Sequence, residues 1–326
     1  MKNTVMDIDI SKDKIDYCLI NSESHQVIQR GEVVNDRKEL LQFLNKIDLQ
    51  QTSFAMEHTG QYGAMLSWVL SEKKAFYYLL NPLELKRSLG VHRGKTDAID
   101  AYRIANYAIK NSHALKAFEL PCENLRKLKA MVSTKHQIVK ISIQLQNSIK
   151  ANVILSKTLD IKRMIKEQKA QLKSVKKLIN SLAEQMQAVI DSCEQLKKSY
   201  RKITQVIGVG PLTAIKCISE TDNFTRFINA RKFSCHCGLA PFPYQSGSSI
   251  KGRTRTHYLK NANLKSILFK AATSAIQHDP QLRNYYNRKL DEGKHKLSVL
   301  NAVANKIVLR IFAVVNRDET FIKLNA

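Results

Sequence analysis

Four acidic residues have positions that could bring their carboxylates around a metal ion. Asp9 lies in the first apolar strand pattern, and Glu57 ends a later one, "SFAME". Asp97 and Asp100 follow in "KTDAIDA", where a spacing of three places both on one helix face. Carboxylate and phosphate oxygens are preferred ligands of Mg²⁺, and metal ions can hold the attacking and leaving oxygens of phosphoryl transfer. Each acid alone is equally compatible with a solvated surface or a helix start. As a set they predict a site for Mg²⁺, with Mn²⁺ as a possible substitute.

The elements around these acids predict an α/β layer domain. Residues 3–33 form three alternating apolar and polar runs separated by turn-like segments, which predicts an antiparallel meander. Strand patterns at 53–58 and 75–80 then alternate with helical patterns up to about residue 110. Two of the acids would therefore come from strands and two from the last helix of this domain.

The rest of the chain has a helical pattern. From Pro121 to Tyr200 the pattern is that of long helices. Its second half, from Leu172 to Tyr200, carries apolar residues at alternating steps of three and four, which is typical of a coiled coil, whereas the first half, from Leu125 to Val153, is weaker. Such a seam could pair within one chain as an antiparallel hairpin or join two chains. The seam residues are Leu172, Val175, Ile179, Leu182, Met186, Val189, Cys193, Leu196 and Tyr200.

A further helical region starts with "ITQVIGVGPLTA". Gly208 and Gly210 are similar to the turn of a helix-hairpin-helix, in which the backbone approaches a phosphate and the next helix offers free N–H groups. A glycine-rich corner between two packed helices is the alternative. These patterns predict three domains, at residues 1–115, 116–200 and 201–326.

Positive charge is concentrated after residue 100. Residues 1–100 hold 13 Lys and Arg against 14 Asp and Glu, whereas the remaining residues hold 40 against 14. A near-neutral domain thus precedes a strongly cationic body, which favours nucleic acid as a partner. The candidate phosphate contacts are Arg93, Lys95, Lys251, Arg253 and Arg255.

The cysteines and the apolar stretches indicate in which cellular compartment the protein is expected. Six cysteines occur without paired spacing, and "SCHCG" at 234–238 has no second cysteine pair at the spacing of a zinc site. The chain has no signal-like apolar start, and its longest apolar stretch, from Leu297 to Val315, contains Lys306 and Arg310. We expect a cytoplasmic, nucleoid-associated protein that does not enter a membrane.

Three motifs resemble the insertion sequence 110 family of transposases, which have a DEDD, RuvC-like domain, and the related Piv pilin-gene invertases. "DIDISK" is similar to the family's Gly-Ile-Asp-Val-Ser-Lys, with Asp9 at the metal-binding acid and Asp7 where glycine is usual. "EHTGQYG" resembles the Glu-x-Thr-Gly segment at Glu57, and "KTDAIDA" resembles the Asp pair. The resemblance implies an α/β plus α fold: a RuvC/RNase H-like N-terminal domain, central coiled-coil helices, and a mostly helical C-terminal transposase domain.

The same family has a nucleophilic serine, and Ser246 occupies its position in "GLAPFPYQSGSSIKGRTR". A serine hydroxyl that attacks a phosphodiester gives a covalent intermediate that conserves the bond for rejoining. Ser248 and Ser249 are competing hydroxyls nearby, and a flexible Gly/Ser linker is the alternative interpretation.

The resemblance implies a bacterial transposase or site-specific recombinase that cuts and rejoins DNA as a homodimer or tetramer. The acids of one subunit could serve the serine of another, and many relatives are directed by a structured bridge RNA encoded beside their gene. The alternatives are a junction-resolving nuclease that uses water, an invertase that reads DNA directly, and a nucleic-acid-binding protein without enzymatic activity.

Overall fold

The computed structural model describes residues 2–88, 97–227, 229–247 and 250–317. The chain divides into two compact units, Met1–Leu120 and Pro121–Ala326. The α5–α6 hairpin and the C-terminal helices belong to the same second unit. The three-domain division remains a prediction.

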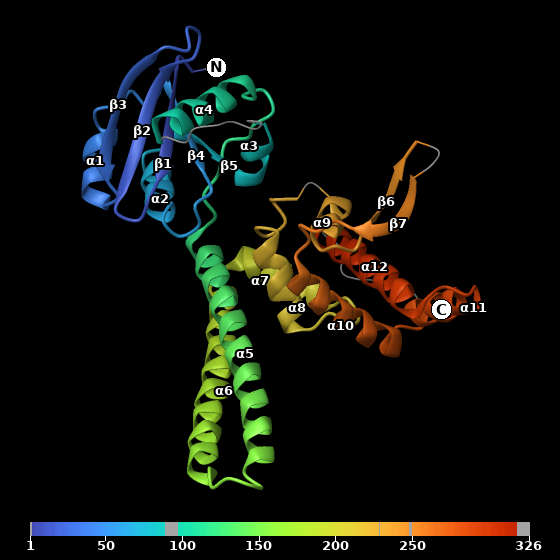
Figure 1. Cartoon of the computed structure of the whole chain (residues 1–326). Helices are drawn as coiled ribbons and strands as arrows, with labels where there is room; N and C mark the ends of the chain where they lie inside the picture. The colour runs from blue at the N-terminus through green and yellow to red at the C-terminus, as the bar shows by residue number, and fades with distance from the viewer. Residues whose placement is uncertain (1, 89–96, 228, 248–249, 318–326) are drawn as a thin grey trace. The chain divides into compact units, whose positions relative to one another are not determined.

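A five-stranded sheet in the order β3-β2-β1-β4-β5 forms the centre of the first unit (Figure 1). Strands β1, β2 and β3 pair antiparallel, as the predicted meander requires, and β4 and β5 continue from β1 in parallel. The mixed α/β architecture expected for this unit is therefore confirmed. The strands are β1 (Thr4–Ile10), β2 (Lys14–Asn21), β3 (Val27–Val34), β4 (Thr52–Glu57) and β5 (Phe76–Leu80).

Alternate strand residues point to opposite sides of the sheet, and both sides carry apolar residues. Helices therefore cover both faces. On one face, Ile8 and its alternate neighbours in β1 pack against α1 (Arg37–Leu44) and α2 (Ala64–Glu72). On the other face, Val5 and Ala55 share a core with buried residues of α3 (Pro82–Ser88) and α4 (Asp97–Lys110). The second face carries the candidate acids.

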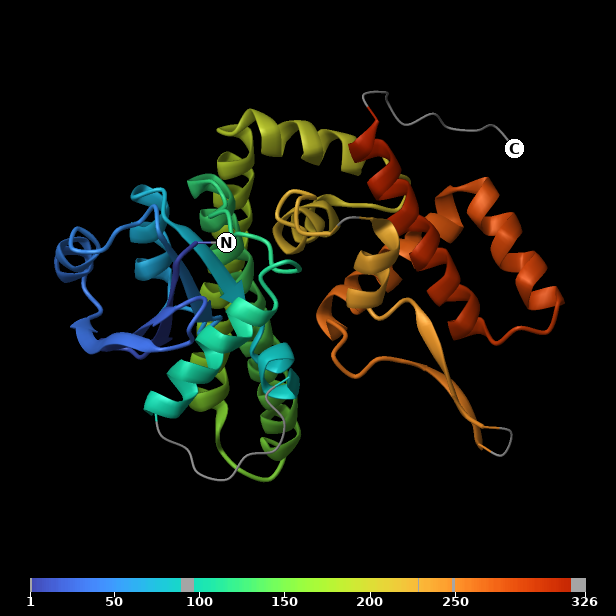
Figure 2. The same cartoon turned by 90° about the horizontal axis from the view of Figure 1, so that it is seen from above.

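The second unit begins with two long antiparallel helices, α5 (Glu123–Leu155) and α6 (Lys162–Asp191) (Figure 1). Leu182 and Met186 of the predicted seam are buried, so the apolar stripe of α6 is used within one chain. The seam was expected to run unbroken to Tyr200, but α6 ends at Asp191 and α7 (Glu194–Thr204) starts in a new direction. Figure 2 shows this change of direction between the two helices, and the backbone of Cys193 is extended at the break. Leu196 is buried in the core of the C-terminal helices.

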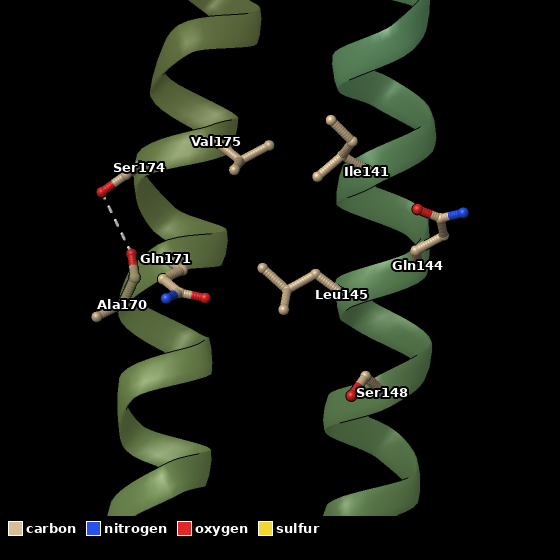
Figure 3. A pocket seen from close by; sticks show the side chains of 8 residues that line it. All are labelled: Ile141, Gln144, Leu145, Ser148, Ala170, Gln171, Ser174 and Val175. Carbon is tan, nitrogen blue, oxygen red and sulfur yellow. Dashed lines mark hydrogen bonds between the residues drawn. The ribbon is translucent and has the colours of Figure 1, made fainter.

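An apolar groove of about 750 Å³ lies between α5 and α6. Ile141 and Leu145 of α5 point toward α6 across it, and Val175 and Gln171 of α6 point toward α5 (Figure 3). Ile141 remains about half exposed, at 52%. The hairpin therefore keeps apolar surface in contact with solvent in the single chain.

The remaining helices surround one large core, and a two-stranded hairpin extends from them. They are α8 (Pro211–Glu220), α9 (Ala230–His236), α10 (Ala262–His278), α11 (Pro280–Asp291), α12 (Lys296–Asn316) and a hairpin of β6 (Pro241–Ser246) and β7 (Ile250–Thr256). The helix starts are fixed locally, since Asn229, Asn261 and Asp279 each accept a backbone N–H of the following helix. Helix α12 is long and apolar enough to cross a membrane by length and composition, yet Val303 and Ile307 lie in this core.

Candidate functional site

Asp9 and Glu57 lie at the ends of two adjacent parallel strands. Strands β1 and β4 pair from Thr4 opposite Thr52 to Ile8 opposite Met56, so the next residue of each strand is one of these acids. Asp9 shares its side of the sheet with Val5, and Glu57 shares its side with Ala55. Both carboxylates are thus on the α4 face at the carboxyl edge of the sheet, and both are partly exposed.

Helix α4 brings the second pair of acids toward this edge. Its later residues Ile104 and Ala108 pack on the sheet. Near its middle, Asn106 Oδ1 lies 2.5 Å from Nδ1 of His25, at the opposite end of the sheet from Asp9. The helix therefore runs back along the strands, and its first turn is directed toward the strand ends.

The positions of Asp97 and Asp100 follow from that direction. They form the first turn of α4, seven and four residues before Ile104, which places their backbone positions in the stripe that meets the sheet. Their side chains lie outside the described residues, as do Arg93 and Lys95. Among the side chains that the structure describes, no three Asp, Glu, His or Cys residues form a metal-binding group.

Asp7 is a further acid on the same face, and its position in the sequence predicts no role for it. It is fully buried, in register between Cys18 of β2 and Ala55 of β4. Burial raises the pKa of the Cys18 thiol, and the negative charge of Asp7 adds to the rise. Placing a carboxylate in a sheet core is costly without compensation. The signal in the sequence was the alternation in "DID", which puts Asp7 directly below Asp9.

The candidate nucleophile is located at the tip of the β6–β7 hairpin. Ser246 is the last residue of β6 and is in register with Ile250, the first residue of β7. Gly252 lets the ring of Tyr244 pack across the two strands, since a Cβ there would meet Tyr244 Cδ1 at 2.8 Å. The side chain of Ser246 and the competing residues 248 and 249 lie outside the described residues.

The predicted alternation of cations is present in the backbone of the hairpin. Lys251, Arg253 and Arg255 are alternate residues of β7, so their positions lie on one side of the strand. Arg255 is exposed, and the side chains of the other two lie outside the described residues. Figures 1 and 2 both show the hairpin projecting from the helices of its unit.

The base of the hairpin is anchored to helices α9, α10 and α12. Lys265 Nζ donates to the Gly238 carbonyl at 2.9 Å, and Asn301 Nδ2 donates to the Leu239 carbonyl at 2.7 Å. The Asn261 N–H donates to the His236 carbonyl at 2.8 Å, just after β7. These bonds place the two ends of the hairpin on rigid helices, while the tip extends away from them.

The two glycines of the predicted helix-hairpin-helix turn have different surroundings. Gly208 has φ +90°, and a Cβ there would lie 2.5 Å from the Ala271 carbonyl of α10. The close packing of the turn between α7 and α8 on helix α10 explains this glycine. Gly210 is the exposed N-cap residue of α8 and has open space around it, so the start of α8 is accessible to a phosphate.

The "SCHCG" segment forms the end of α9. Cys237 is buried, as is Cys217 of α8, and burial raises the pKa of the Cys217 thiol to about 12. Burial also raises the pKa of Cys237. Both cysteines are packed in the apolar core of the second unit.

Comparison with known proteins gives the family of this architecture. A transposase profile matches residues 7–158, and the profile of the IS116/IS110/IS902 transposase family matches residues 200–287. A pilin gene-inverting protein of Moraxella bovis is 24% identical over 99% of both chains. The transposase for insertion sequence element IS1111A of Coxiella burnetii is 23% identical over 74% of this chain and 72% of its own length. An uncharacterized IS110 protein of Streptomyces coelicolor is 33% identical over 36% of this chain and 29% of its own.

Proposed function

Because the chain belongs to the IS116/IS110/IS902 family of transposases, we propose that it cuts and rejoins DNA with a divalent-metal centre and a serine nucleophile. The family assignment makes it a DNA transposase or recombinase and implies dependence on a divalent metal. The metal would be Mg²⁺, held by Asp9, Glu57, Asp97 and Asp100. The observation that carries this proposal is the position of the first two acids at adjacent strand ends, facing a helix that begins with the other two.

The sheet supports a RuvC-like assignment for the first unit. An antiparallel meander continued by parallel strands, with helices on both faces, places the acids at one edge of the sheet. Their oxygens are the hard ligands that Mg²⁺ prefers. The neighbouring positions of Asp9 and Glu57 at the ends of two paired strands support a shared ion. When bound, the ion would stabilise the charge on phosphate oxygens during strand cleavage. The partly exposed positions of Asp9 and Glu57 leave room for a DNA phosphate at this edge.

The serine would act by phosphodiester exchange. The Ser246 Oγ forms a new bond to phosphorus, the bond from phosphorus to the leaving strand oxygen breaks, and the hydroxyl proton is transferred so that the leaving strand ends as a hydroxyl. Rejoining is the reverse step with a hydroxyl of another strand, and it releases Ser246. The projecting hairpin, anchored at its base, supports this role because the tip can reach a DNA backbone.

We further propose a structured guide RNA and a homo-oligomer as partners. The 40 basic residues after residue 100 suit a polyanion, and contacts to a phosphate backbone alone cannot select a sequence. Base pairing with a bound RNA would supply that selection. A directly reading DNA invertase is the second candidate, because a relative named as a pilin gene-inverting protein matches over 99% of the chain.

The deciding experiment is a search for a covalent protein–DNA adduct. The full chain is incubated with terminal DNA of its element and Mg²⁺, and the products are separated on a denaturing gel. We expect an adduct that is lost with Ser246→Ala or with a chelator, and kept with Ser248→Ala or Ser249→Ala. Full cleavage by Ser246→Ala, with no adduct in the parent, would show that water is the nucleophile and refute the serine role.

A further inference from the structure

A pocket of about 520 Å³ lies between helices α11 and α12. Leu282, which is buried, and Leu309, which is 45% exposed, contribute apolar surface to it. The amides of Gln281 and Asn284 contribute polar groups. A pocket of this size, mostly apolar and with a few polar groups, is suited to one small ligand.

Two cations are held beside one aromatic ring in this pocket. Lys306 Nζ lies 4.4 Å from the ring centroid of Tyr285, and the Arg288 guanidinium carbon lies 5.8 Å from it. Cation–π contacts of this kind orient the side chains without neutralising them. Within the part of the chain that the structure describes, neither cation has a carboxylate within ion-pair distance. Lys289, and Arg288 more weakly, lower the pKa of Glu292, but Glu292 is ion-paired with Lys289 at 2.5 Å.

A third cation holds the wall of the pocket in place. Arg310 on α12 forms an ion pair with Asp279 and also donates to Gln281 Oε1. Asp279 is buried and caps α11 by accepting the Leu282 N–H at 3.0 Å. A buried, hydrogen-bonded pair of this kind is costly to break. The pocket is therefore a preformed feature in which Arg310 is structural, while Arg288 and Lys306 are available to an anion.

We propose that this pocket binds one unpaired nucleotide of single-stranded DNA. The base would occupy the apolar cleft beside Leu309, and the flanking phosphates would pair with Arg288 and Lys306. Charge complementarity selects a phosphate-bearing ligand, and the apolar cleft selects a base that is free of its partner, since a paired base is buried in the duplex. The inference rests on the proposed function, because strand exchange generates unpaired DNA.

The test measures binding of the full chain to three labelled probes by fluorescence anisotropy: a 12-nucleotide oligo-dT, a duplex of the same length, and oligo-U RNA. The variant Arg288→Met/Lys306→Met removes both free cations and keeps chains of similar length. The control Lys38→Met/Lys46→Met removes the same charge from exposed positions of the first unit. Thermal melting followed by circular dichroism shows that both variants fold.

The expected effect is specific to the single strand. Each lost phosphate contact lowers the slope of log affinity against log salt by about 0.7, so the pocket variant should lose about 1.4 in slope and bind about 25-fold more weakly at 0.1 M salt. The control should match the parent. Leu309→Glu, an exposed substitution that puts a like charge beside the phosphates, should also weaken oligo-dT binding while leaving the duplex unaffected.

A second readout locates the contact. Photo-crosslinking with 5-iodouracil in the DNA strand should place adducts on the peptides of α11 or α12. Equal losses in the pocket and control variants, or adducts only elsewhere, would overturn the proposal, and a larger loss on oligo-U than on oligo-dT would overturn the assignment to DNA. If Ser246→Ala cleaves normally while the pocket variant loses oligo-dT binding, the serine role fails and the pocket stands. If the pocket variant binds oligo-dT as tightly as the parent while Ser246→Ala is inactive, the pocket proposal is refuted and the serine role stands.

Discussion

Glu220 of α8 forms the charged centre of the helices that carry the serine hairpin. Its carboxylate lies 3.5 Å from His236 Nε2 and 3.4 Å from Lys216 Nζ, and Lys216 is only 9% exposed. The contact with His236, followed by the charge and hydrogen bond of Lys216, lowers the pKa of Glu220 from 4.5 to about 2. Since the His236 carbonyl also accepts the Asn261 N–H after β7, this cluster helps to hold the base of the hairpin.

The substitution Glu220→Gln should therefore destabilise the second unit in a pH-dependent way. The decrease in the pKa of Glu220 from 4.5 to about 2 corresponds to about 3 kcal/mol of the free energy of unfolding at neutral pH, because one pKa unit is worth about 1.36 kcal/mol. Because the folded-state pKa is depressed, this stability is complete above pH 4.5 and is lost as the pH falls toward 2. The difference between the parent and Glu220→Gln should thus be about 3 kcal/mol at pH 7 and should shrink through that window.

The assay follows unfolding of the full chain in denaturant with two probes. Far-UV circular dichroism reports mainly the helices of the second unit, whereas the fluorescence of Trp68, the single tryptophan, reports the first unit. At pH 7 we expect the dichroism transition of Glu220→Gln to occur at a lower denaturant concentration than that of the parent. The transition reported by Trp68 should be unchanged. If Glu220→Gln has the same free energy of unfolding as the parent at pH 7, Glu220 does not contribute in this way. The same follows if the difference in free energy of unfolding stays constant from pH 4.5 to 2.

The remaining predictions concern the metal site and the packing of the second unit. Asp9→Asn and Glu57→Gln should each abolish strand cleavage in a gel assay but keep DNA binding, and a variant with near-parental cleavage would exclude that residue as a ligand. Gly208→Ala should lower the free energy of unfolding by about 2 kcal/mol in denaturant titrations, since its Cβ meets the Ala271 carbonyl; a neutral result would contradict this packing. Leu182→Lys should cost about 3 kcal/mol, because it buries an ammonium between α5 and α6. If Leu182→Lys instead keeps the stability of the parent but forms a smaller oligomer by light scattering, the seam lies between chains.

The strand acids could be located from the sequence because strand geometry is local. Alternation with a period of two places Asp9 on the face of β1 opposite Ile8 and Ile10, and the position of Glu57 at the end of an apolar run places it at a strand end. A meander followed by alternating strands and helices leaves few ways to order the sheet. The edge that these acids share thus follows from short-range pattern and general rules of chain connection.

Other features depend on contacts between distant segments, which no local pattern contains. The heptad pattern continues through Cys193, yet the helix ends there because Leu196 is buried among the C-terminal helices. Gly208 resembles a phosphate-binding turn, but the Ala271 carbonyl, 63 residues further along, explains its lack of a side chain. In the same way, only the packing of α11 on α12 brings Lys306 to the ring of Tyr285.

The division of charge between the two parts of the chain has a consequence for the reaction. In the proposed mechanism, carboxylates that hold a metal would repel DNA phosphates until the ion is bound, so the near-neutral first unit, with buried Asp7 and partly exposed Asp9, would attract DNA weakly by itself. The excess of 26 positive charges after residue 100 can supply the attraction that this unit lacks. Affinity and chemistry are then carried by different residues, which explains why neutralising an acid should stop cleavage without weakening the complex. If binding and cleavage were instead lost together in Asp9→Asn, the acids would be needed to form the DNA-binding surface itself.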